Sequence, residues 1–211
     1  RTLCQILSQD SSADVRAAAA QGLGRFAFLS QEGKLLERDC ERVSQSLLET
    51  LQDEKVDLHV RRRCLEAAAI LNTSEIVKYI EWAYKSDNLD LKCSSLYAMG
   101  KTGESDWLPA LMDELESPLP ALRYEAANAC AELEEETAVP HLIPIIDDDD
   151  LQVQLSAIRA IGAIGGPLAK KTLRRYLRSG DPVIEEAAQD SLDMIDTMED
   201  PISFKSFKYR S

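Results

Sequence analysis

Small and apolar residues recur along the chain with a spacing that indicates stacked amphipathic helices. Six segments share one pattern, and the first step between them is 45 residues while each of the next four is 31 residues. Counted from the start of each segment, which we call repeat position 0, positions 4, 7 and 8 are small or apolar and share one helix face with positions 0 and 11. That face is predicted to be buried. The segments begin at Val15, Val60, Leu91, Leu122, Val153 and Ile184.

Helix-capping residues support these predicted starts. Side chains of Ser, Asp and Asn accept hydrogen bonds from the free amides of a first helical turn. Leu119 takes the capping place of the fourth segment, where Ser117 is expected to supply the cap instead. The other segments carry, three residues before their starts, Ser12, Asp57, Asn88, Asp150 and Asp181.

A second set of apolar columns predicts a leading helix before each segment. One of these columns contains Ile80, Leu111, Leu142 and Leu173. Because one helix pair cannot bury its faces alone, stacked pairs are expected to share a continuous core. The first repeat is expected to be incomplete, with a second helix but no leading helix. The longer first step places an insertion within residues 28–54, with a longer helix over 33–51, which is either a tolerated insertion or a docking edge.

The best-kept copy of the pattern runs from Asp14 to Gly24 and reads Asp-Val-Arg-Ala-Ala-Ala-Ala-Gln-Gly-Leu-Gly. Over residues 10–196 the chain resembles HEAT repeats, in particular the short group named after phycobilisome lyases. The resemblance implies an all-α fold, a right-handed α-α superhelix of about five and a half helix pairs. It implies one domain over 1–200. The residues that follow, 201–211, are basic and aromatic and are expected to form a tail that is either mobile or docked. The fold hosts many activities and does not define the function.

Composition narrows the classes of partner. The chain has 37 acidic and 24 basic residues and a net charge of −13, and an acidic surface repels phosphate backbones. No apolar run is long enough to cross a membrane. The first residues carry no secretion signal, and a start at Arg1 is expected of a piece of a longer or processed protein. We therefore expect a cytoplasmic protein with no nucleic-acid or membrane partner.

Residues with catalytic or metal-binding spacing are missing from the sequence. The five cysteines lack a C-x-x-C pair, which predicts free thiols in a reducing compartment. His59 and His141 stand in different repeats, and no His-Glu pair of the kind that holds two irons in the HEAT-like deoxyhypusine hydroxylases is present. The aspartates at 147–150 lack the spaced ligands of a calcium loop and are expected to be solvated. We expect no catalytic residue, no metal and no cofactor.

A basic residue recurs at repeat position 1 and predicts a structural ladder. Each of these residues is expected to pair with a carbonyl or carboxylate near the turn between two helices. The last two segments carry Gln and Glu instead, which predicts a weaker C-terminal end. The ladder is Arg16, Arg61, Lys92, Arg123, Gln154 and Glu185.

The helix face opposite the core is the predicted partner-binding surface. Repeat positions −1, 2, 3, 6 and 10 lie there, and the resemblance to HEAT-like proteins places this face on the concave side of the superhelix. Exposed tyrosines among charged residues are typical anchors, which favours Tyr97 and Tyr124. Asp90, Ser94, Gln152, Ser156 and Asp190 share the face. The predicted binding residues are His59, Arg62, Arg63, Glu66, Tyr97, Lys101, Tyr124, Glu125, Asn128, Glu132 and Arg159.

These patterns predict a non-catalytic scaffold that binds a protein partner on the concave helix face. The alternative is a bilin lyase-like or chaperone-like module that handles a tetrapyrrole or its carrier protein. Arg62, Arg63, Tyr97 and Lys101 would then supply cations and aromatic walls. Imperfectly capped terminal repeats would also allow end-to-end self-association.

Overall fold

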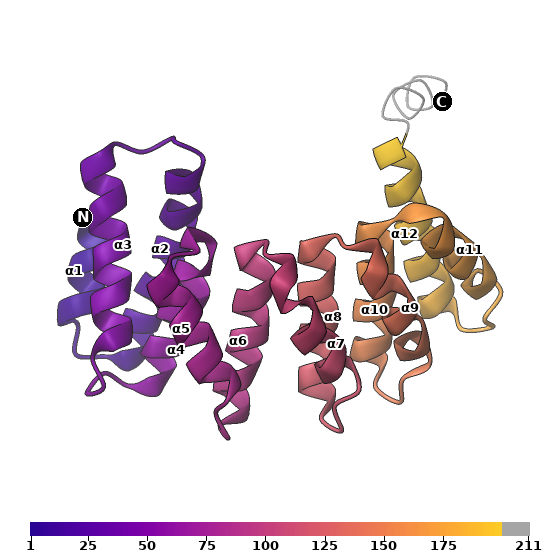
Figure 1. Ribbon diagram of the computed structural model, residues 1–211, viewed down its shortest axis with the longest axis horizontal. Coiled ribbons are helices and arrows are strands. Elements are labelled where there is room, and N and C mark those ends of the chain that lie inside the picture. The colour runs from indigo at the N-terminus through magenta and orange to yellow at the C-terminus, as the bar shows by residue number, and fades with distance from the viewer. Residues whose placement is uncertain (200–211) are drawn as a thin grey trace. The chain divides into compact units, whose positions relative to one another are not determined.

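The computed structural model describes residues 1–199, which form α-helices and short 3₁₀ helices without a strand (Figure 1). The chain divides into two compact units, the first covering Arg1–Glu104 and the second beginning at Ser105. The single domain expected over 1–200 stays a prediction. The tail expected over 201–211 lies outside the described residues.

The first unit alternates leading helices with second helices. Each leading helix packs on the second helix that follows it, and α2, α4 and α6 pack side by side in that order. The leading helices are α1 (Thr2–Gln9), α3 (Glu37–Gln52) and α5 (Ser74–Tyr84). The second helices are α2 (Ala13–Gln31), α4 (Leu58–Ala68), which the 3₁₀ helix η1 (Ala69–Leu71) continues, and α6 (Leu89–Thr102).

The second unit repeats this arrangement, with α10 packed between α8 and α12. Its leading segments are η2 (Ser105–Trp107) with α7 (Leu108–Leu115), then η3 (Glu136–Ala138), α9 (Val139–Leu142) and η4 (Ile143–Asp147), then α11 (Gly166–Tyr176). Its second helices are α8 (Pro120–Leu133), α10 (Leu151–Ile164) and α12 (Pro182–Glu199).

One prediction about the first repeats is wrong and another needs new bounds. Helix α1 packs on α2, so the first repeat has its leading helix, and residues 1–199 hold six helix pairs rather than five and a half. The longer helix expected over 33–51 is α3, which runs from Glu37 to Gln52. The preceding residues of the insertion extend α2 to Gln31 and turn at Gly33 with a φ of 65°.

The predicted core columns are buried, which confirms the all-α repeat fold. Position 0 is 0–5% exposed in the five later second helices, but Val15 at the same position of α2 is 43% exposed. The reason is that, within residues 1–199, no helix pair stands before α1 and α2 to cover this side. At the other end, Gln189 of α12 is exposed at position 5, where the earlier second helices bury Ala, Leu or Ile. A polar residue at this position is typical of a capping repeat, and self-association through the terminal repeats stays a prediction.

The predicted helix caps form with one exception. The side chains of Ser12, Asp57, Asn88, Asp150 and Asp181 each accept a hydrogen bond from a backbone amide in the first turn. The Ser117 hydroxyl instead accepts from the amide of Leu119, before the helix begins, and α8 has no side-chain cap. Pro120 at the first helical position leaves α8 one fewer free amide to satisfy.

The ladder at position 1 ties each second helix to the turn before it. Lys92 lies over the Tyr84 ring at 5.1 Å, Gln154 Nε2 donates to Asp148 O, and Glu185 Oε1 accepts from Gly180 N. The two substituted positions therefore still bond their turns, and the weaker C-terminal end stays a prediction. The arginine contacts are Arg16 Nε to Leu7 O at 2.7 Å, Arg61 Nε to Leu51 O at 3.0 Å, and Arg123 Nη1 to Ser117 O at 2.8 Å.

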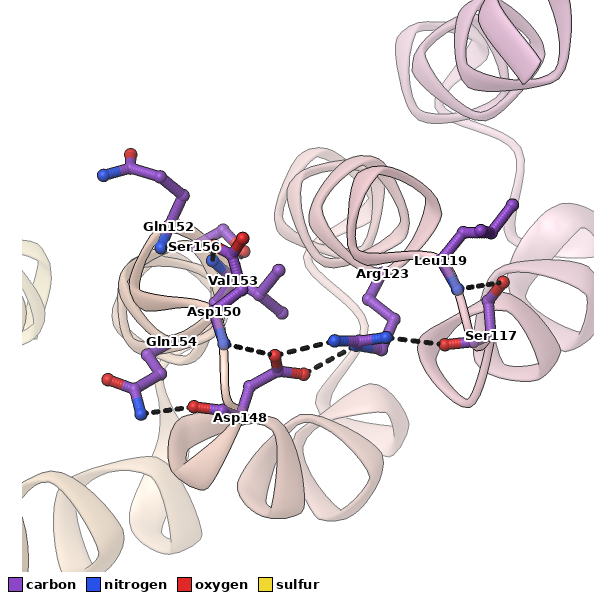
Figure 2. A network of polar contacts seen from close by, with 9 residues as sticks. All are labelled: Ser117, Leu119, Arg123, Asp148, Asp150, Gln152, Val153, Gln154 and Ser156. Carbon is purple, nitrogen blue, oxygen red and sulfur yellow. Dashed lines mark hydrogen bonds and ion pairs between the residues drawn. The ribbon is translucent and has the colours of Figure 1, made fainter.

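Arg123 also joins two neighbouring repeats of the second unit through Asp148 (Figure 2). Arg123 Nε donates to Asp148 Oδ2 at 2.6 Å and Arg123 Nη2 donates to Asp148 Oδ1 at 2.7 Å. The two side chains are only 16% and 7% exposed. The hydrogen bonds from Arg123 hold the pKa of Asp148 below its ordinary value and raise the pKa of Arg123. Asp150 caps α10, as predicted, and Asp147 accepts from the Tyr176 hydroxyl. Asp147 and Asp149 are exposed, as expected of a solvated run, whereas Asp148 is held by Arg123.

Matched substitutions at position 0 test the packing. Val60→Ala empties part of a fully buried site and is expected to lower the free energy of unfolding by about 2 kcal/mol. Val15→Ala removes the same atoms from an exposed site, with an expected change below about 0.5 kcal/mol. Urea titration followed by circular dichroism measures both. Equal losses would show that Val15 is buried in solution.

The Arg123–Asp148 pair predicts a dependence of stability on pH. Because the folded-state pKa of Asp148 is lowered, its contribution is present above the unfolded pKa of about 3.9 and is lost as pH falls through the folded value. Asp148→Asn is expected to cost about 2–3 kcal/mol at pH 7 and progressively less toward pH 3. Asp149→Asn, at an exposed neighbour, is the control. Parallel stability curves for wild type and Asp148→Asn would contradict the pairing.

Candidate partner-binding site

A pocket of about 350 Å³ lies on the exposed side of α2, α4 and α6 in the first unit. Its walls come from repeat positions 6 and 10, the columns predicted to face away from the core. Gly24 and Ala67 line it between these longer side chains, and Phe28 and Arg63 complete it. The residues at positions 6 and 10 are Gln21 and Arg25, Glu66 and Ile70, and Tyr97 and Lys101.

The pocket exists because α2 and α4 approach closely through small residues. A Cβ atom added at Gly24 would lie 3.4 Å from both Cα and Cβ of Ala67. This distance is an ordinary van der Waals contact, so an alanine at residue 24 would also fit against Ala67. The small residues Gly24 and Ala67 leave a depression between the longer side chains at repeat positions 6 and 10.

Glu66 is held in one place by contacts from two helices. Its Oε2 accepts from Arg63 Nη1 at 2.6 Å, and its Oε1 accepts from the Ser94 hydroxyl at 2.6 Å. Ser94 in turn accepts from Arg62 Nε at 3.0 Å, and Arg62 Nη1 pairs with Asp90 Oδ2 at 2.8 Å. The Glu66 side chain is 14% exposed. Its charge is therefore balanced and its rotamer fixed.

The cations of the pocket outnumber this one carboxylate. Lys101 Nζ lies 5.5 Å from the centroid of the Tyr97 ring, within the range of a cation–π contact. Arg25 is exposed, and among the described residues it has no carboxylate within ion-pair distance. The pocket is thus a local cationic and aromatic site in a chain of net charge −13.

Four of the predicted binding residues meet in this pocket, namely Arg63, Glu66, Tyr97 and Lys101. Two others in the same unit do not line it. Arg62 is 16% exposed and its guanidinium bonds Asp90 and Ser94, whereas His59 Nε2 lies 4.0 Å from Asp14 Oδ1.

The predicted exposure of two serines at repeat position 3 is wrong. Ser94 is 2% exposed and Ser156 is completely buried. Ser94 lies against α4, where it contacts Arg62 and Glu66. Because neighbouring second helices pack side by side, they cover this edge of the expected exposed face.

The predicted binding residues of the second unit do not gather in one place. Tyr124, Glu125 and Asn128 are half-buried on α8, and Glu132 is exposed at its end. Arg159 lines a pocket of about 370 Å³ between α10 and α12. Its other lining residues include Leu155, Val183, Glu186, Asp190 and Met194.

Six lining residues of the first pocket were absent from the predicted set, namely Gln21, Gly24, Arg25, Phe28, Ala67 and Ile70. Gln21 and Arg25 occupy positions 6 and 10 of the first repeat, so extending the same count to α2 would have found them. Phe28 was assigned to the insertion over 28–54. It lines the pocket because α2 continues through it to Gln31.

Other candidate chemistry is sparse in the described residues. Residues 1–199 contain no group of three or more His, Cys, Asp or Glu residues placed to hold a metal ion. All five cysteines are free, as predicted, but only Cys64 and Cys130 are fully buried, and burial raises the pKa of each to about 12. Thiols with so high a pKa are poor nucleophiles at neutral pH. None of the helices in this range is long and apolar enough to span a membrane.

Comparison with known families identifies the class of repeat protein. The profile for HEAT repeats matches residues 76–154 and 108–193, and a profile for the single HEAT repeat matches residues 1–30. The chain therefore belongs to the HEAT-repeat family.

Curated relatives include two enzymes. The phycocyanobilin lyase subunit alpha of Microchaete diplosiphon is 29% identical over 104 residues, covering 46% of this chain and 32% of its own length. The deoxyhypusine hydroxylase of Schizosaccharomyces pombe is 21% identical over 192 residues, covering 89% of this chain and 57% of its own length. The chain thus spans between a third and just over half of these relatives.

Solved structures share the fold at low sequence identity. The complex of CpcE and CpcF of phycocyanin lyase from Nostoc sp. PCC7120 aligns with a TM-score of 0.59 at 17% identity, over 92% of this chain and 75% of that one. A designed armadillo repeat protein in complex with a (KR)4 peptide aligns with a TM-score of 0.54 at 16% identity, over 92% of this chain and 98% of that one. The likeness shows a helical repeat solenoid.

Proposed function

We propose that the chain is a non-catalytic scaffold that binds a protein partner through the exposed face of its second helices. The pocket on α2, α4 and α6 is the proposed contact site. The observation that carries this proposal is the gathering of Phe28, Tyr97, Arg25 and Lys101 around a fixed carboxylate, Glu66.

The contacts of Glu66 favour binding because they order the site in advance. Immobilising a long side chain on association costs about 0.5–1.5 kcal/mol, and a residue already held in place avoids that cost. Tyr97 is 41% exposed and Phe28 is 50% exposed, so both present aromatic surface that a partner can cover. Aromatic and arginine side chains of this kind dominate the free energy of many interfaces.

Two neighbours named as complexes are consistent with this role. One is the complex of CpcE and CpcF of phycocyanin lyase, and the other is a designed armadillo repeat protein bound to a peptide. These partners are those of the two neighbours, and they support the proposal only because similar solenoids form complexes.

A pair of phenylalanines on α2 allows a matched test. Phe28→Ala combined with Tyr97→Ala removes the pocket aromatics, whereas Phe26→Ala removes a 38%-exposed ring that does not line the pocket. We expect a partner captured from lysate by wild type and by Phe26→Ala to be retained at least tenfold less by the double variant. The readout is affinity capture with mass spectrometry, with circular dichroism as the folding control. Equal retention by all three proteins would contradict a partner site at this pocket.

A second candidate function is the handling of a bilin. The relatives named phycocyanobilin lyase favour it, together with the meeting of cations and aromatic rings in one pocket. The test mixes the chain with phycocyanobilin and records the visible absorbance spectrum. A shift that is present in wild type and absent in Arg25→Glu/Lys101→Glu would support this function, and an unchanged spectrum would reject it.

A further inference from the structure

We propose that the chain segment over 201–211 docks into the groove between α10 and α12 and covers the outward face of the last repeat. The groove is the pocket of about 370 Å³ that Arg159 lines, and the segment lies outside the described residues. This contact is separate from the proposed partner site on α2, α4 and α6, because both helices belong to the second unit. The apolar surface of the groove, its charges and the reach of the segment support it.

An exposed apolar stripe runs along α12 from the groove to the end of the helix. Val183, Ala187 and Met194 line the groove at repeat positions −1, 3 and 10, and Leu155 of α10 lies across from them. Met198 continues the same helix face one turn later. Val183, Met194 and Met198 are 45%, 48% and 54% exposed. The stripe therefore leads from the groove to the point where the segment over 201–211 follows.

The composition of the segment complements this stripe. Pro201 opens the segment, and proline disfavours a helical conformation in the residue before it, which favours a change of chain direction there. The apolar residues that follow are Ile202, Phe204, Phe207 and Tyr209. Methionine side chains make favourable contacts with aromatic rings. The groove supplies the methionine and the segment supplies the rings.

The charges of the two parts are also complementary. Helix α12 has six acidic residues and no basic one, whereas the segment over 201–211 has three basic residues and no acidic one. Asp196 and Glu199 both pair with Lys170. Glu186 and Asp190 at the groove have no cation within ion-pair distance among residues 1–199. These two carboxylates are therefore available to the lysines of the segment.

Arg159 favours an aromatic residue beside those lysines. Its side chain is exposed and lines the groove from α10. Within residues 1–199 no carboxylate lies within ion-pair distance of it. A guanidinium group is attracted to the face of an aromatic ring within about 6 Å. A segment that alternates rings and cations thus matches a groove with one cation beside two carboxylates.

The segment is long enough to reach the whole groove. Met194 lies five residues before Glu199, about 8 Å along the helix axis, and Val183 lies sixteen residues before it, about 24 Å. An extended chain rises about 3.3 Å per residue, so Phe204 reaches up to about 16 Å and Phe207 up to about 26 Å from Glu199. A segment that turns back along α12 can therefore place Phe204 against Met194 and Phe207 toward Val183.

The covalent link favours this occupant over a separate partner. A segment joined to its site by a short link is present at a local concentration in the millimolar range. A contact too weak to hold a free peptide is then still occupied most of the time. A partner that binds the outward face of α10 and α12 would have to displace the segment first.

Methionine oxidation of the full chain tests the contact. Hydrogen peroxide converts an accessible methionine to its sulfoxide, and mass spectrometry measures the rate at each site. We expect Met194 to oxidise at least threefold faster in Phe204→Ala/Phe207→Ala than in wild type, because the rings no longer cover it. Met112, half-buried on α7, is the internal control and is expected to keep its rate. Equal rates for Met194 in the two proteins would overturn the proposal.

A second variant of the segment isolates the role of the rings. Ser203→Ala/Ser206→Ala changes two neighbouring residues and keeps both phenylalanines. We expect Met194 to oxidise in this variant at the wild-type rate. A rate as fast as in Phe204→Ala/Phe207→Ala would overturn burial of the rings in the groove. Circular dichroism confirms that each variant folds.

Charge-matched variants test the carboxylates. Asp190→Lys and Glu116→Lys change the net charge by the same amount, but Glu116 is exposed at the end of α7 and does not line the groove. We expect Asp190→Lys to speed oxidation of Met194 at least twofold and Glu116→Lys to leave it unchanged. Added to Phe204→Ala/Phe207→Ala, Asp190→Lys is expected to have no further effect. Equal effects of the two charge variants, or the same acceleration without the rings, would overturn the pairing.

Dilution separates a contact within one chain from a contact between copies. Protection of Met194 is expected to stay constant over a tenfold range of protein concentration. Protection that falls on dilution would place the segment of a second copy in the groove and overturn docking within the chain. None of these outcomes changes the test of the scaffold function, which depends on Phe28 and Tyr97 in the first unit.

Discussion

The close approach of neighbouring second helices is the constraint on which this structure depends. Between α2 and α4 the contact is made by Gly24 and Ala67, and between α10 and α12 by Gly162 and Ser191. A Cβ atom at Gly162 would lie 2.6 Å from the Cβ of Ser191, a distance that real side chains do not adopt. Interiors packed this tightly tolerate little added volume. The small residues therefore fix the helix spacing, and with it the spacing of every side chain on the exposed face.

The pocket follows from the same constraint. Small residues between α2 and α4 leave space that the longer side chains at positions 6 and 10 surround. The second helices are in turn tied to their turns by the ladder at position 1, which includes Arg16 and Arg61 in the first unit. Helices anchored at one end and packed along one side present their exposed residues in a fixed arrangement. Such an arrangement is what a rigid binding surface requires.

Much of the fold could be predicted because the same spacing of small and apolar residues recurs in six segments of the chain. The core columns and most caps follow from spacing alone, since burial and capping are local properties of a helix. Helix α1 was missed because it lies before the 45-residue step, where the 31-residue spacing that revealed the other leading helices does not apply. Ser94 was misplaced because a single helix does not reveal how far its neighbour covers its edge. Arg25 was missed because the count of outward positions began at the second repeat, and Phe28 was missed because it was assigned to the insertion.

Hydrogen–deuterium exchange of the chain with and without its captured protein partner tests the central claim most directly, because it locates the bound partner on the intact chain. The account predicts slower amide exchange in α2 around residues 21–28, in α4 and η1 around 63–70, and in α6 around 97–101, with α10, α11 and α12 unchanged. Slower exchange confined to α10–α12, or a bound partner with no change in α2, α4 and α6, would contradict it.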